Sequence, residues 1–234
     1  MALNEIVLNY LFIQASILLF LSPFLLVYFF SYPELKFRHI LFNKFAEDFL
    51  ASKYANWLIF LWAAAEATVW FVIPEFLLLL IIFLKIKNKK KLLVYDFLGT
   101  ILGTVIGLII FFTFKIDLAK VPYVTEGMIR QVDFWYKNLG ILALIHQPFS
   151  GIPYKVFLYS ASKFSFFLPI FFTFAIVIRM TRYYILYFIF DGLYPFFHRF
   201  ISKKYTYIFF LSCLIFSIML LKIVLSYGSL FKAY

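Results

Sequence analysis

Apolar segments long enough to cross a lipid bilayer recur along this chain and constrain its fold more than any other feature. A helix needs about 20 predominantly apolar residues to cross the hydrocarbon core. The segments that meet this length are residues 6–30, 92–114, 164–190 and 205–227. The sequence therefore predicts an all-α fold, a polytopic membrane helical bundle.

The composition excludes the main soluble classes of protein. Hydrophobic residues make up 65% of the chain and charged residues only 14%, whereas soluble domains carry about 25% charged residues. A chain this apolar and poor in charge is not intrinsically disordered, and the single cysteine, Cys213, cannot form an intrachain disulfide. The net charge of +11 would suggest nucleic acid in a soluble protein. Basic loops beside membrane helices instead face anionic headgroups, so we expect membrane lipids as partners and no nucleic acid.

The apolar runs and the polar stretches between them divide the chain into three parts. Residues 1–31 are predicted to be an N-terminal transmembrane anchor, because Glu5 replaces the basic start of a cleaved signal peptide. Residues 32–204 form the predicted membrane domain, which begins with an amphipathic interfacial helix within residues 31–53. Residues 205–234 are the predicted C-terminal transmembrane helix and tail.

Residues 57–84 are apolar but contain Glu66 and the pair Pro74-Glu75. A charge at membrane depth costs about 2.5 to 3.5 kcal/mol on insertion scales, so both carboxylates must face something polar. On one continuous helix, nine residues at about 100° each would point the two acids in opposite directions. A break at Pro74 would instead give two arms too short to span, which predicts a re-entrant hairpin over about residues 57–84.

A second interrupted segment covers residues 139–158. It contains Gln147-Pro148 and Gly151-Ile152-Pro153, and the mixed-charge residues 115–137 that precede it are predicted to be interfacial. Paired interrupted segments in corresponding positions are typical of inverted-repeat transporters, whose substrate site lies near the bilayer midplane. The Lys and Arg counts of the loops leave open whether these segments re-enter or span the membrane.

Residues 92–114 contain a stripe of glycines at intervals of four, Gly99, Gly103 and Gly107. Such a stripe permits close helix packing, either within the bundle or in a dimer, so the oligomeric state stays open. Asp96 lies on the same face. It is either a carboxylate favoured in the first turns of a helix or a functional residue.

Three short motifs resemble the DedA family, also called VTT or SNARE-associated domain proteins, in the branch with a Pro-Ile-Pro-Tyr-Lys-Val-Phe signature. They are residues 66–75 with Glu-Ala-Thr and Ile-Pro-Glu, residues 149–157 with Ile-Pro-Tyr-Lys-Val-Phe, and residues 179–183 with Arg-Met-Thr-Arg-Tyr. The resemblance implies two oppositely oriented re-entrant hairpins in a helical bundle. It also implies lipid movement across the bacterial inner membrane, notably of the phosphorylated polyprenyl carrier of envelope synthesis, with scramblases among eukaryotic relatives.

The resemblance also implies roles for individual residues. Glu66 and Glu75 match the family's two hairpin acids, Lys155 matches its second-hairpin cation, and Arg179 and Arg182 match its arginine pair. A phosphate that enters a low-dielectric site must be matched by cations, and the planar fork of arginine suits its oxygens. Alternatively, the arginines only neutralise the buried acids.

The predicted site therefore has two sets of residues. The substrate-binding set is Lys155, Arg179, Arg182 and Gln147, and the proton-coupling set is Glu66, Glu75 and Asp96. The predicted function is a lipid flippase or scramblase for a polyprenyl phosphate or phospholipid, with coupling to protons through carboxylates poised between their charged and neutral forms.

Enzymatic chemistry has little support in the sequence. The three histidines, His39, His146 and His198, lack metal-ligand spacing, and no G-x-S-x-G or Walker motif is present. We expect no enzyme activity, no metal and no cofactor. A membrane lipid phosphatase or transferase and a non-transporting membrane scaffold remain the alternatives.

Overall fold

The computed structural model describes residues 38–68, 89–114, 118 and 123–229. Within these ranges every regular element is helical. The predicted N-terminal anchor, the second arm of the first predicted hairpin and Glu75 lie outside the described residues.

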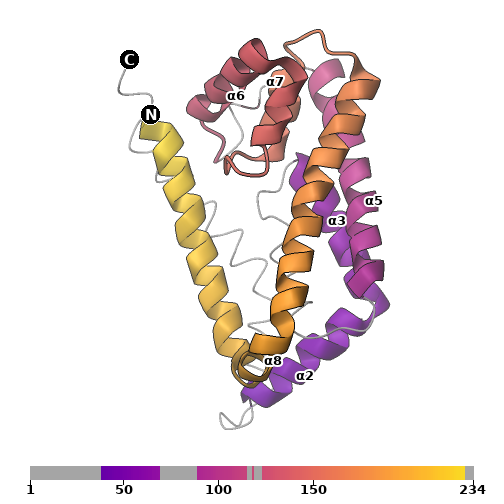
Figure 1. Cartoon of the computed structure of the whole chain (residues 1–234), viewed down its shortest axis with the longest axis vertical. Helices are drawn as coiled ribbons and strands as arrows, with labels where there is room; N and C mark the ends of the chain where they lie inside the picture. Colours follow the sequence, from indigo (N-terminus) through magenta and orange to yellow (C-terminus); the bar gives the residue numbers. More distant parts are fainter. Residues whose placement is uncertain (1–37, 69–88, 115–117, 119–122, 230–234) are drawn as a thin grey trace.

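The first part of the described chain contains three helices. They are α2 (Arg38–Ala51), α3 (Lys53–Thr68) and α5 (Lys89–Leu108), and a π-helical turn (Ile109–Thr113) extends α5. Ser52 joins α2 to α3, because its hydroxyl donates to the Phe49 carbonyl at 2.6 Å and accepts from the Tyr54 amide at 3.2 Å. Helices α3 and α5 lie side by side (Figure 1).

The glycine stripe of α5 lies in a tight contact inside the chain. A Cβ atom at Gly103 would lie 2.6 Å from the Ala64 carbonyl oxygen of α3, and one at Gly107 would lie 2.6 Å from Cδ1 of Leu158. A Cβ atom at Gly99 would lie even closer to the carbonyl oxygen of Phe60. Of the two roles that the sequence left open for this stripe, the structure shows packing between helices of one chain.

The middle of the chain folds into α6 (Glu126–Leu139), a 3-10 helix η3 (Gly140–His146) and α7 (Tyr154–Ala161). Thr125 caps α6, because its hydroxyl accepts from the Met128 amide at 3.3 Å. Helix α7 lies in the main core, and Val156, Phe157 and Leu158 are fully buried.

The chain turns between η3 and α7, over residues 147–153. Its amide groups bond locally, as from Ser150 to the His146 carbonyl at 3.0 Å and from Ile152 to the Ser150 hydroxyl at 3.2 Å. Gly151 has a φ of 72°, a left-handed conformation that suits glycine. The predicted interruption of residues 139–158 is therefore a short helix, a turn and a second short helix.

The last element, α8 (Leu168–Ser229), differs from the prediction. We expected two spans joined by a basic link over residues 191–204, but the chain remains helical through the link, with Pro195 inside the helix. Figure 1 shows α8 as two arms that fold back on each other at a bend beside α2. We call residues 168–197 the first arm and residues 207–229 the second arm. Pro195 lacks a backbone N–H and its ring crowds the carbonyl four residues earlier, which explains a bend in this region.

Two described helical stretches are long and apolar enough to cross a membrane, Lys90–Thr113 and Leu168–Phe197. A third apolar helix, Leu211–Ser226, is shorter. Large apolar side chains are exposed on both candidate spans, among them Leu98 and Val105 in the first and Phe188 in the second. Exposed apolar surface of this extent favours contact with lipid over contact with water.

Candidate functional site

Tyr154, the first residue of α7, is fixed by a hydrogen bond inside the core. Its hydroxyl lies 3.2 Å from the hydroxyl of Thr104 in α5. The Thr104 hydroxyl donates its one hydrogen to the Thr100 carbonyl at 2.7 Å, so Tyr154 must be the donor in the pair. This bond holds the ring of Tyr154 beside the guanidinium of Arg179.

Arg179, on the first arm of α8, lies against that ring and is fully buried. Its guanidinium forms an ion pair with the carboxylate of Glu66 in α3. The guanidinium carbon also lies 4.5 Å from the ring centroid of Tyr154, a cation–π distance. Glu66 is only 3% exposed, so both charges of the pair have left the solvent. Removal of either partner would leave a buried charge without its counter-charge.

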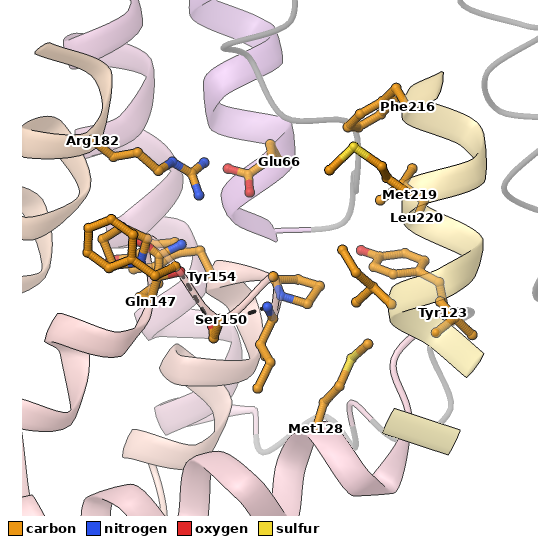
Figure 2. Close-up of a pocket in the computed structure, with 17 residues that line it drawn as sticks. Glu66, Tyr123, Met128, Gln147, Ser150, Tyr154, Arg182, Phe216, Met219 and Leu220 are labelled. Atoms are coloured by element: carbon orange, nitrogen blue, oxygen red, sulfur yellow. Dashed lines mark hydrogen bonds between the residues drawn. The ribbon is translucent and has the colours of Figure 1, made fainter. Parts of the chain in front are cut away.

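A cavity of about 420 Å³ lies between the two arms of α8 (Figure 2). Polar side chains occupy one side, and Arg182 extends from the first arm toward Glu66. The opposite wall is apolar and consists of residues of the second arm, Phe216, Met219, Leu220, Ile223 and Val224. The cavity therefore has a charged side and a hydrocarbon side.

Gln147 also borders this cavity, from the turn after η3. Its side chain is 2% exposed, and its Oε1 accepts no hydrogen bond from the described part of the chain. A buried amide oxygen without a donor is costly, so this position is suited to a bound molecule or water with a donor group.

The structure separates the predicted site residues into two groups. Glu66, Gln147 and Arg182 line the cavity. Arg179 is not among the lining residues and lies behind the wall, where it contacts Glu66 and Tyr154. Asp96 is fully buried in α5 and does not line the cavity, and Glu75 lies outside the described residues.

Lys155 is also behind the wall. Its side chain is fully buried, and its ammonium lies 5.0 Å from the ring centroid of Tyr123. Among the described residues, Arg182 is the cation in direct contact with the cavity.

The sequence did not single out two parts of the site. Tyr154 lies within the Ile-Pro-Tyr-Lys motif but carries no charge, and aromatic residues form 24% of the chain, so nothing distinguished this ring from the others. The apolar wall from residues 216–224 was similarly hidden in a predicted span. Its distance in sequence from Arg182 prevented any inference that the two meet.

The described residues hold no group of three or more His, Cys, Asp or Glu side chains arranged to hold a metal ion. Comparisons of the chain with family models, with curated proteins and with solved structures found no match.

Proposed function

We propose that this protein moves amphiphiles with a phosphate headgroup across a membrane, as a flippase or scramblase. The observation that supports this best is the cavity between the arms of α8, which has Arg182 and Glu66 on one side and an apolar wall on the other. Its volume of about 420 Å³ lies within the range of small-molecule sites, about 300 to 1,000 Å³. A phosphate bound there would pair with Arg182, and apolar groups beside it would contact the wall.

The finer topology is part of the same proposal. Residues 139–161 form a helix, a turn and a helix, each too short to span, and we propose that they re-enter the membrane against the bundle. The resemblance to the DedA family supports a polytopic protein of the bacterial inner membrane. It also supports a polyprenyl phosphate carrier or a phospholipid as the substrate.

We further propose that Glu66 couples this movement to protons. While Glu66 is ionised, it holds Arg179 in the buried ion pair. Protonation of Glu66 would remove the counter-charge of Arg179, which would then favour an anion in the adjacent cavity.

Reconstitution into liposomes tests the proposal. The assay would compare the movement of a fluorescent polyprenyl phosphate with that of a fluorescent phosphatidylcholine. Arg182→Gln removes the cation at the cavity, and we expect it to slow movement roughly tenfold, about the effect of one lost charge-assisted hydrogen bond. Arg130→Gln is the matched control, because Arg130 is an exposed arginine of α6 paired with Glu126.

The other possible results distinguish lipid movement from the alternative functions. Folded protein that moves neither lipid would contradict the proposal and favour a scaffold. Release of inorganic phosphate from the polyprenyl phosphate would favour a lipid phosphatase. Equal activity of Arg182→Gln and the wild type would exclude Arg182 as the phosphate-binding cation.

A further inference from the structure

A second cavity, of about 430 Å³, adjoins Arg182. It lies between the first arm of α8 and the end of η3 with its following turn. Its lining residues are Ile145, Pro148, Phe149, Ile178, Thr181, Arg182, Ile185 and Leu186. Pro148, Phe149 and Arg182 line both cavities, so the two spaces meet at the turn and share one cation.

The lining of the second cavity is almost entirely hydrocarbon. Its polar side chains are those of Arg182 and Thr181. The Thr181 hydroxyl donates to the Val177 carbonyl at 2.8 Å, so its one hydrogen is already used. Arg182 is thus the group in this cavity that recognises an anion, and the remaining surface suits apolar groups only.

We propose that the second cavity binds the hydrocarbon chain of the amphiphile whose phosphate is held by Arg182. This inference rests on the proposed function and adds the location of the chain. An amphiphile has an anion joined to a long apolar chain, and the two cavities present a cation where they meet and apolar surface beyond it. Ile145, Phe149 and Ile185 line the cavity and are also exposed, so the chain would extend from Arg182 toward the surrounding lipid.

Photo-crosslinking in phosphatidylcholine nanodiscs tests the location of the chain. The probe is dodecyl phosphate with a diazirine on its chain, and the background probe is dodecanol with the same diazirine. Any apolar probe labels lipid-facing side chains, so only the excess with the phosphate probe counts. We expect this excess on residues 145–149 and 178–186 to be roughly tenfold, as the charge-assisted contact with Arg182 implies.

Two threonines of the first arm provide a matched pair of variants. Thr173 and Thr181 are both exposed, and each donates to the carbonyl four residues earlier, at 2.9 and 2.8 Å. Only Thr181 lines the second cavity. Thr181→Trp should fill the cavity and remove the tenfold excess, whereas Thr173→Trp should keep it.

A second pair covers the case in which Thr181→Trp fails to fold. Ile185 and Ile189 are about half exposed on the same arm, and only Ile185 lines the cavity. Ile185→Trp should remove the excess and Ile189→Trp should keep it.

The results separate this inference from the proposed function. Phosphate-dependent crosslinks on residues 216–224 would place the chain against the second arm and overturn the inference, even if the protein moves lipid. An unchanged excess in folded Thr181→Trp or Ile185→Trp would also overturn it. Excess crosslinks at the second cavity in a protein that moves no lipid would support the binding site and contradict transport.

Discussion

Arg179 and Glu66 form a buried ion pair that joins α8 to α3, and the ring of Tyr154 from α7 covers the same guanidinium. Three elements that are distant in sequence therefore meet at one side chain. A charge is retained in such a place only where its partners are fixed, because the cost of desolvation must be offset by the pairing. The ion pair and the Tyr154 ring therefore bring α3, α7 and α8 together beside the cavity.

Loss of one partner of this pair should strongly destabilise the fold. We expect Glu66→Gln and Arg179→Met each to lower the free energy of unfolding by about 3 to 5 kcal/mol, because each leaves a buried group unmatched. The double variant should cost less than the sum of the two. Unfolding in detergent measures all three. Glu126→Gln, which breaks the exposed pair with Arg130, should change stability by about 0.5 kcal/mol or less. Strict additivity of the two single effects would contradict the pairing.

The proposed proton coupling predicts a change in how transport depends on the gradient. Glu66→Gln cannot titrate, so lipid movement by the folded variant should no longer respond to an imposed proton gradient or to external pH. The measurement is the liposome assay with and without a pH difference across the membrane. A Glu66→Gln protein that keeps the wild-type gradient response would refute the coupling role of Glu66 and leave it a structural residue.

The glycines of α5 and α8 should respond oppositely to the same substitution. A Cβ at Gly103 would meet the backbone of Ala64, so Gly103→Ala should destabilise the protein by about 1 to 3 kcal/mol. A Cβ at Gly192 would meet nothing within 4 Å, so Gly192→Ala should be neutral or stabilising by up to about 1 kcal/mol. Thermal unfolding of the two variants checks this. An unaffected Gly103→Ala would show that α3 and α5 are less closely packed.

Local sequence features predicted the helices and the interrupted segment. The apolar run of residues 92–114 corresponds to α5 with its π-helical turn, and Pro148, Gly151 and Pro153 marked the turn before α7. The continuity of α8 was not predictable in this way. A basic stretch that contains Pro195 predicts an interruption of the helix, because proline cannot donate the backbone hydrogen bond, yet the chain stays helical through it.

The charged part of the site was easier to predict than its partners. Glu66 and Arg182 stand out because ionisable residues in apolar segments are rare and costly. The pairing of Glu66 with Arg179 depends on how distant helices pack, and no local pattern encodes it. The same is true of the second cavity, whose isoleucines resemble any other apolar residues of the span.

Arg182 on the charged side of the first cavity and the whole apolar wall opposite it belong to one helix, α8. Arg182 lies 13 residues before Pro195, which corresponds to about 20 Å of helix at 1.5 Å per residue. At that radius, a change of about 10° in the angle between the arms moves one wall against the other by roughly 3 Å, close to the diameter of a water molecule. The angle of the distant bend therefore affects the width of the cavity, although no residue of the bend needs to touch the molecule inside.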